Sequence, residues 1–454
     1  MRDVTPELLP TTHRLSGGAE LTAVTTDRFK TGSLTVSTVL PVDRRNSPLD
    51  NLLFSVLSRA TATHPTLREM NRHMDLLYDL TLFDRNLRMG DLQILGNGIH
   101  FLDPAYLPAS EDARAIGEEN VQMLVDSLYA PLYAEDGCFR ADYVELERTN
   151  QCDGIRDEKN NPGTYAEKRC RELTFPDSPY GTPLYGTVEA VSAFTARELT
   201  DRYAALLPHA ALRFFYVGSQ TGEQMAETLD RALCDSAGRP FTDGTLRTAV
   251  PPLSVPGDPG VPCRFEETLP VSQGRLEMIL SAGADLRSEE LFTAMVYNEL
   301  LGASPTSKLF MNVREKQSLC YSCYSAYDFY KGCISVSAGI RCDNRERAEE
   351  EILRQIGELR LGHITRSELD GAIRYLQMLY TGLYDSPSGI ENYFFSRSIY
   401  GVSCPPSELR KRIAAVTVED VTRYAQRVYP LSVYFLRGTR PGRAGEEDAD
   451  ESEF

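Results

Sequence analysis

Two stretches far apart in this chain read as the same structural unit, a helix that leads into a short strand. They are TARELTDRYAALLPHAALRFFYVG at residues 195–218 and TVEDVTRYAQRVYPLSVYFLRG at residues 417–438. Each opens with a threonine and an acidic residue three positions later, the capping box that starts a helix. Each ends in an aromatic and β-branched run closed by glycine. They lie about half of the 454-residue chain apart, which predicts an internal duplication and two similar domains.

A second pair of segments supports the duplication. Residues 71–86 and 312–329 both read as a helix running into a strand, and Tyr78 and Tyr321 take equivalent places in them. Residues 235–262 are dense in proline and glycine, which is typical of a linker. We therefore expect an N-terminal domain, a linker, a C-terminal domain and an acidic tail, at residues 1–234, 235–262, 263–440 and 441–454.

Within each half, hydrophobic periodicity and turn residues predict strands, helices, strands and again helices. The expected strands lie at residues 19–25, 30–41, 79–87, 91–101, 263–281, 319–329 and 333–341. The expected helices lie at residues 48–60, 66–78, 111–128, 139–173, 288–317, 343–361, 366–385 and 418–428. Separate runs of strands and helices indicate an α+β fold, in which each half is an antiparallel-rich sheet with helices on one face.

Charge and composition exclude several classes of protein. The formal net charge is −17, and the acidic tail is too polar to pack, so we expect it to be disordered. An acidic chain disfavours nucleic acid, which needs a basic surface. No stretch approaches the roughly 20 apolar residues that span a bilayer, and the N-terminus lacks the apolar segment of a signal peptide. The ten cysteines are scattered rather than framed for disulfides. We expect a cytoplasmic protein without nucleic-acid or membrane partners.

Residues 307–324, SKLFMNVREKQSLCYSCY, place an arginine on an amphipathic helix and a tyrosine on the strand that follows. Arg314 and Tyr321 lie seven residues apart across this turn. A packed core has no need of either group there. A site that binds peptide carbonyls would use both, because guanidinium and phenol groups donate hydrogen bonds. The alternative is structural: Arg314 pairs with Glu315 on the helix surface, and Tyr321 merely packs.

The same segment begins a cluster of cysteines that could be read as a zinc site. Its members are Cys320, Cys323, Cys333 and Cys342. Cys320 and Cys323 have opposite parity on a strand, so their side chains should point to opposite faces. We therefore expect free thiols in packed strands rather than a metal site.

The arginine and tyrosine segment and a second motif resemble the M16 peptidase family, which includes insulinase, pitrilysin and mitochondrial processing peptidase. Residues 178–208 are similar to the family's glycine-bearing segment with its threonine-capped helix. Residues 307–327 are similar to its C-terminal-half motif, a helix leading to Arg-Glu and then Leu-x-Tyr. The resemblance covers roughly residues 10–440 and implies the M16/LuxS-like metallohydrolase fold in both halves. Within the family, the chain resembles the bacterial YfmF-type members, a name associated with 5-aminopentanol modification of elongation factor P.

The family's zinc motif, an inverted His-x-x-Glu-His on the first helix, is absent from this chain. In the family, two histidines hold zinc and the glutamate activates water. The resemblance places Asn51, Phe54 and Ser55 at the three positions, and none of these side chains can take over those roles. Glu147 stands near the place of the third zinc ligand. It is either a remnant of that ligand or a solvated helix charge.

The remaining histidines form no metal-binding pattern. His64 and His73 are nine residues apart and share no helix face. We expect no metal or other cofactor in this chain, and zinc in a partner instead. The resemblance thus implies a non-catalytic subunit that forms a heterodimer with a zinc-bearing M16-type paralogue. There, Tyr321 would stabilise the oxyanion formed on a peptide or unfolded protein segment, and Arg314 would bind a neighbouring carbonyl.

Peptides in this family add a strand to a sheet edge, and the expected edge here is residues 81–87. Its residues Asp84, Arg85 and Asn86 fit equally well as charges that protect an edge from pairing. The alternative function is a structural or peptide-binding scaffold with no role in proteolysis. An enzyme of another kind has little support, because the chain has no GxSxG, P-loop or GxGxxG after a strand.

Overall fold

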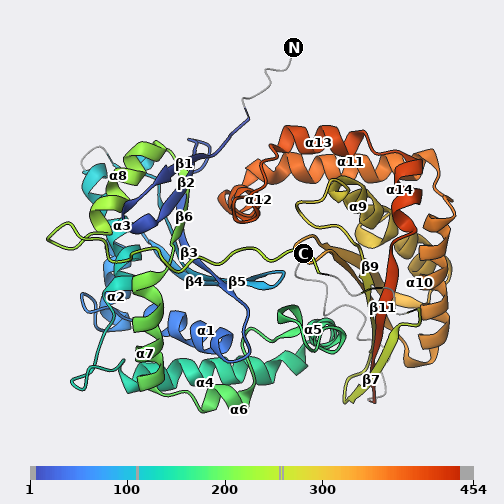
Figure 1. The fold of residues 1–454 in the computed structure, drawn as a ribbon, viewed down its shortest axis with the longest axis horizontal. Coiled ribbons are helices and arrows are strands. Elements are labelled where there is room, and N and C mark those ends of the chain that lie inside the picture. The colour runs from blue at the N-terminus through green and yellow to red at the C-terminus, as the bar shows by residue number, and fades with distance from the viewer. Residues whose placement is uncertain (1–6, 109–111, 255–256, 258–259, 440–454) are drawn as a thin grey trace. The chain divides into compact units, whose positions relative to one another are not determined.

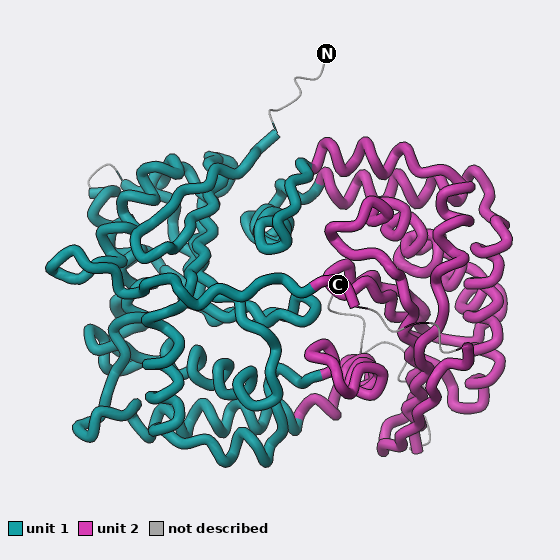
Figure 2. The backbone as a smooth tube through the Cα atoms, in the orientation of Figure 1, with its two compact units in different colours: residues 1–156, 182–251, 382–405 teal, residues 157–181, 252–381, 406–454 magenta. Residues whose placement is uncertain are grey.

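The chain forms two compact units, each built on its own β-sheet (Figures 1 and 2). The structure, a computed structural model, describes residues 7–108, 112–254, 257 and 260–439. Unit 1 comprises residues 1–156, 182–251 and 382–405, and unit 2 comprises residues 157–181, 252–381 and 406–454. The expected acidic tail at residues 441–454 lies outside the described residues.

Unit 1 contains a six-stranded sheet in the order β1-β2-β6-β3-β5-β4. Every neighbouring pair is antiparallel except β2 and β6, which run parallel. The strands are β1 (Thr11–Arg14), β2 (Glu20–Thr25), β3 (Thr31–Pro41), β4 (Thr81–Met89), β5 (Leu92–Leu102) and β6 (Arg213–Gly218). The long strands alternate apolar and small polar residues, because opposite faces meet different partners.

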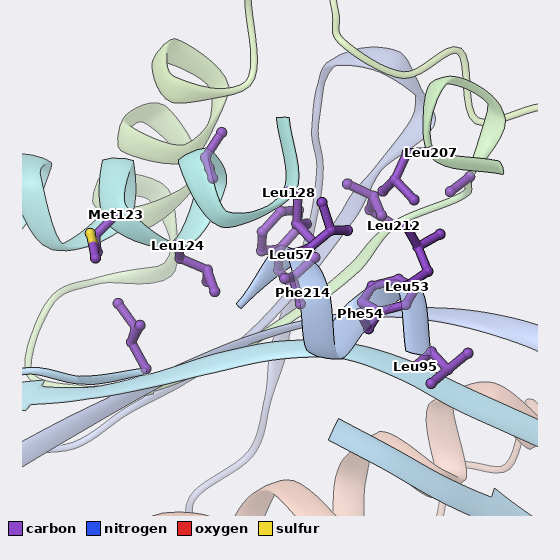
Figure 3. Close-up of a cluster of buried hydrophobic side chains, with 14 of the residues drawn as sticks. Leu53, Phe54, Leu57, Leu95, Met123, Leu124, Leu128, Leu207, Leu212 and Phe214 are labelled. Atoms are coloured by element: carbon purple, nitrogen blue, oxygen red, sulfur yellow. The ribbon is translucent and has the colours of Figure 1, made fainter. Parts of the chain in front are cut away.

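One face of this sheet packs against helices to form the core of unit 1 (Figure 3). This core includes Leu53, Phe54 and Leu57 of one helix and Leu124 and Leu128 of another. The α-helices of unit 1 are α1 (Asn46–Leu57), α2 (Leu67–Leu76), α3 (Ala113–Tyr129), α4 (Ala141–Asp157), α6 (Val188–Ser192), α7 (Ala196–Leu206), α8 (Gly222–Ala232) and α12 (Pro387–Tyr400).

The other face of the same sheet is covered by α12. Leu34 and Val36 of β3 belong to the core, whereas Thr35 between them points the opposite way and donates to Glu391 of α12 at 2.6 Å. Ser386 caps the helix, and Pro387 follows at a position where its missing N–H costs nothing. A helix from late in the chain therefore completes the first sheet.

Unit 2 repeats this arrangement on a five-stranded sheet in the order β7-β11-β8-β10-β9. Only β7 and β11 run parallel. The strands are β7 (Cys263–Leu269), β8 (Gly274–Ser281), β9 (Cys320–Asp328), β10 (Cys333–Ile340) and β11 (Tyr429–Gly438). The helices are α5 (Pro162–Thr174), α9 (Leu291–Asn298), α10 (Arg345–Arg360), α11 (Arg366–Gly382), α13 (Pro406–Ala414) and α14 (Val418–Ala425), with π-helices at Glu299–Ala303 and Leu309–Lys316.

The helix α5 of the first sequence half packs on the sheet of unit 2. Ala166 and Cys170 of α5 share a buried cluster with Ile279, Tyr434 and Leu436. Each sheet thus carries helices on both faces, one more face than the sequence predicts. Each compact unit also includes one helical segment from the other sequence half. Neither compact unit is therefore a single continuous stretch of the sequence.

The predicted α+β class is confirmed, with antiparallel-rich sheets in two similar halves. The helix expected over residues 139–173 is in fact two helices, α4 and α5. Pro162 cannot continue a helix, and Asn161 caps the next one by accepting from the Thr164 amide at 3.1 Å. Five of the strands and α-helices lie outside the ranges expected from the sequence, namely β1, α6, α8, α12 and α13. Within the described residues, no helix is long and apolar enough to cross a membrane.

Candidate functional site

The first helix of unit 1 presents an amide, a phenyl ring and a hydroxyl at the three positions that the resemblance assigns to a zinc motif. Asn51 is buried, donates to Gln151 at 3.1 Å and accepts from the Asn86 amide at 2.7 Å. Phe54 is only 3% exposed and belongs to the hydrophobic core, and Ser55 is half-buried. A neutral amide network and a buried phenyl ring offer no metal ligand and no general base.

Glu147 of α4 is buried and ion-paired, so the expectation of a solvated helix charge is wrong. Its side chain is 4% exposed. Arg59, just beyond α1, donates from Nε at 2.5 Å and from Nη2 at 3.2 Å to its two carboxylate oxygens. Asn150 donates to the same carboxylate at 3.3 Å. The carboxylate is thus satisfied by a bidentate guanidinium within the chain.

His64 and His73 are in contact in the structure, although the sequence analysis expected them to share no helix face. Their rings stack with centroids 4.5 Å apart. The reason is the turn before α2, which returns His64 alongside the helix that carries His73. Burial and the neighbouring His73 ring lower the pKa of His64. Among the described residues, no group of three or more histidine, cysteine or acidic side chains could hold a metal ion.

Arg314 lies on the second π-helix of unit 2 with its side chain 37% exposed. Its guanidinium lies over the Phe310 ring at 4.9 Å, and Glu315 is 3.8 Å away. That separation is too long for a hydrogen bond. The ring holds the arginine stem in place, while the guanidinium keeps N–H groups for another acceptor.

Tyr321 lies on β9, the last strand of its sheet, and is 51% exposed. The turn before it places Ser318 in the left-handed region, with φ of 50°. Leu319 donates its amide to the Val313 carbonyl at 3.1 Å, which closes the helix onto the strand. The helix-to-strand turn therefore holds Arg314 and Tyr321 on one rigid element.

The expectation that Cys320 and Cys323 point to opposite faces is wrong. The β9–β10 register shifts at Tyr321, which has no partner in the ladder. This β-bulge reverses the alternation, so both cysteines are buried on one face while Tyr321 is exposed. Cys333 begins β10 opposite Asp328, at the far end of the hairpin from Cys320. All ten cysteines are free thiols.

The strand expected as a peptide-binding edge, residues 81–87, forms most of β4, and β4 is the edge of its sheet. Two of its three polar residues do not protect that edge. Arg85 is buried and forms an ion pair with Glu391 of α12, and Asn86 bonds to Asn51. Only Asp84 faces solvent. Interior partners therefore account for Arg85 and Asn86, and the edge keeps a single exposed charge.

Glu299, in the π-helix that follows α9, is a buried acid that was not expected from the sequence. It is 3% exposed, and its Oε1 has no hydrogen-bond partner in the described part of the chain. Burial raises the pKa of this carboxyl from 4.5 to about 7. The only sequence signal was one acid within the apolar run of residues 291–301.

This carboxyl predicts a pH-dependent stability. The folded pKa is the higher one, so the folded state binds the proton more tightly and stability falls as pH rises from about 4.5 through about 7. At about 1.4 kcal/mol per unit, the full loss is about 3 kcal/mol. Glu299→Gln should be more stable than the parent by up to about 3 kcal/mol near pH 8 and equal near pH 4, measured by urea unfolding. The exposed Glu315→Gln serves as control, and an equal gain at both pH values would contradict the assignment.

The chain is similar to several known proteins. Residues 193–376 match the family described as "Peptidase M16 inactive domain". The chain is therefore similar to inactive members of the M16 peptidase family. It is 24% identical to "Probable inactive metalloprotease YmfF" of Bacillus subtilis over 424 residues, covering 93% of this chain and 96% of that protein.

Two solved structures share the fold. One is a conserved protein from Enterococcus faecalis, with a TM-score of 0.85 and 23% identity over 95% of this chain and 99% of that one. The other is a peptidase M16 inactive domain from Pseudomonas fluorescens, with a TM-score of 0.75 and 17% identity over 96% of this chain and all of that one. At these identities, both show the architecture alone.

Proposed function

We propose that this chain is the non-catalytic subunit of a heteromeric M16-type zinc peptidase. One observation supports the proposal: Tyr321 is exposed and Arg314 is partly exposed on one turn at a sheet edge, in a chain that has no His-x-x-Glu-His motif. A tyrosine that only packs would be buried, and the ion pair of Arg314 with Glu315, at 3.8 Å, includes no hydrogen bond. The pair is available to act on something outside the chain.

In the proposed pair, the zinc-bearing paralogue polarises the scissile carbonyl and supplies the water. Tyr321 donates its phenol O–H to the oxyanion that forms, at roughly 3–4 kcal/mol for a well-placed donor. Arg314 binds a neighbouring backbone carbonyl through its N–H groups. The substrate is a peptide or unfolded protein segment, which adds a strand along β4 through main-chain hydrogen bonds. The open edge of β4 supports this mode.

The proposal extends to the compartment and to the metal. Ten free thiols, several in packed strands, suit the reducing cytoplasm. Zinc is expected on the partner alone, since the positions on α1 hold Asn51, Phe54 and Ser55.

The test is reconstitution with the zinc-bearing paralogue. The chain alone should bind no zinc and cleave no unfolded protein. With the paralogue, it should co-elute on size exclusion, and metal analysis should find zinc in proportion to the paralogue. Cleavage of an unfolded protein should then require both chains. If the paralogue alone cleaves as fast as the mixture, the chain is a scaffold and the proposal fails.

A further inference from the structure

The bulge in β9 changes the spacing of the two cysteines that flank Tyr321. Cys320 lies opposite Ile340, and Cys323 lies opposite Ala338. Three steps along β9 therefore match two steps along β10. A strand rises by about 3.3 Å per residue, so two steps separate the Cα atoms of the two cysteines by about 6.6 Å along the strand instead of about 10 Å.

That spacing is within reach of a disulfide bond. Disulfides join residues with Cα atoms roughly 4.4–6.8 Å apart, provided that the side chains point toward one another. By this estimate Cys320 and Cys323 meet the distance condition, and the bulge places both side chains on the same buried face. In a regular strand, the same Cys-x-x-Cys sequence would satisfy neither.

The two thiols also differ in the direction of their pKa shifts, as an attacking and a resolving cysteine do. Interaction with the Cys323 thiol lowers the pKa of Cys320, and the Arg314 guanidinium lowers it further against the opposing effect of burial. The pKa of Cys323 is raised by Cys320 and by burial. The thiolate is the nucleophile in disulfide chemistry. Cys320 is therefore suited to attack first and Cys323 to resolve.

We propose that Cys320 and Cys323 form a reversible disulfide, and that this bond controls how β9 presents Tyr321. The oxidant is a low-molecular-weight disulfide such as oxidised glutathione. The Cys320 thiolate attacks one of its sulfurs, and one glutathione leaves as thiolate. Cys323 loses its proton and attacks the Cys320 sulfur, and the second glutathione leaves. The two protein sulfurs are oxidised, and the glutathione disulfide is reduced to two thiols.

The bond would act on Tyr321 because this residue is the extra one between the two cysteines. A spacing at the upper end of the range means that closing the bond shortens the bulge and turns Tyr321 from its present direction. A disulfide held at such a limit is also more easily reduced, which makes the change reversible. The effect on Tyr321 rests on the proposed function of that residue, whereas the disulfide itself does not.

The test begins with the full-length chain in glutathione buffers of increasing oxidised fraction. After alkylation and trypsin digestion, residues 317–331, QSLCYSCYSAYDFYK, form one peptide that contains only these two cysteines. It should lose two hydrogens and accept no alkyl group, and dithiothreitol should restore both thiols. Cys263 is exposed and provides the internal control, because glutathione should modify it without an internal bond. Two free thiols on residues 317–331 while Cys263 is modified would overturn the proposal.

Two variants sharpen the result. Cys323→Ala should trap glutathione on Cys320, because the resolving thiol is missing, and absence of that adduct would contradict the assigned roles. With the zinc-bearing partner, the oxidised parent should lose most of its turnover and the Cys320→Ala/Cys323→Ala variant should keep it in the same buffer. If the peptide oxidises but turnover stays, control of Tyr321 is refuted. If reduced protein shows no dependence on Tyr321, the proposed function fails, and the peptide map still decides the disulfide.

Discussion

Tyr321→Phe should lower the kcat of the reconstituted peptidase by roughly 100-fold or more, with the fold unchanged. The substitution removes one hydroxyl from a side chain that is 51% exposed, so unfolding curves of parent and variant should coincide. The lost hydrogen bond would form only in the transition state, so KM should change little. Steady-state kinetics on one defined peptide, with saturating partner, measures both constants.

A matched variant separates this effect from general damage. Tyr106 is also an exposed tyrosine, 44% exposed, but lies in unit 1 away from Arg314 and Tyr321 along the chain. Tyr106→Phe should leave kcat at the parent value. Full activity in Tyr321→Phe, or an equal loss in Tyr106→Phe, would show that Tyr321 has no part in the reaction.

Glu391→Gln should destabilise unit 1 by about 3–5 kcal/mol, the cost of leaving a buried guanidinium without its carboxylate. Arg85 and Glu391 are 8% and 6% exposed and form an ion pair between β4 and α12. Thr35 donates to the same carboxylate, and the Arg85 guanidinium lies 5.2 Å from the Phe395 ring centre. The neutral amide leaves the guanidinium charge uncompensated in this apolar layer. Urea unfolding, followed by circular dichroism, measures the loss.

A double variant tests whether the loss of stability in Glu391→Gln comes from the unpaired charge of Arg85 or from the absence of the ion pair itself. Replacing both charges, as Arg85→Met with Glu391→Met, should recover much of the stability, because apolar residues of similar volume often replace a buried pair at little cost. Hydrogen exchange should show α12 less protected in Glu391→Gln than in the double variant. Equal losses in the single and double variants would mean that the ion pair does not hold α12.

The local elements of this protein follow from short-range signals. Thr195 and Thr417 begin their helices with complete capping boxes, as their sequences predict. The long apolar strands β3 and β8 lie where alternation places them. These features depend on hydrogen bonds within a few residues and on burial of one face, and the sequence carries both kinds of information directly.

The site residues show the limit of that reasoning. Alternation along a regular strand predicted that Cys320 and Cys323 face opposite sides of the sheet, but a β-bulge places them on the same side. Helix periodicity predicted that His64 and His73 share no helix face, but the turn before α2 brings their rings into a stacked arrangement. Glu147 resembled a solvated charge because its partner, Arg59, lies 88 positions away in the sequence. In each case the missing information was a contact or irregularity that local propensity does not encode.

By itself, the sequence determined the α+β class in two similar halves and the absence of a His-x-x-Glu-His motif, and it drew attention to Arg314 and Tyr321. Residue identity and short-range periodicity are enough for each of these. Only the tertiary structure decided that α5 and α12 cover the sheets of the opposite sequence halves. It also decided that the buried side chain of Glu147 pairs with Arg59 and that of Arg85 with Glu391. The physical reason is that every sheet has a second face to bury, and any segment of suitable shape can cover it, however far along the chain it lies.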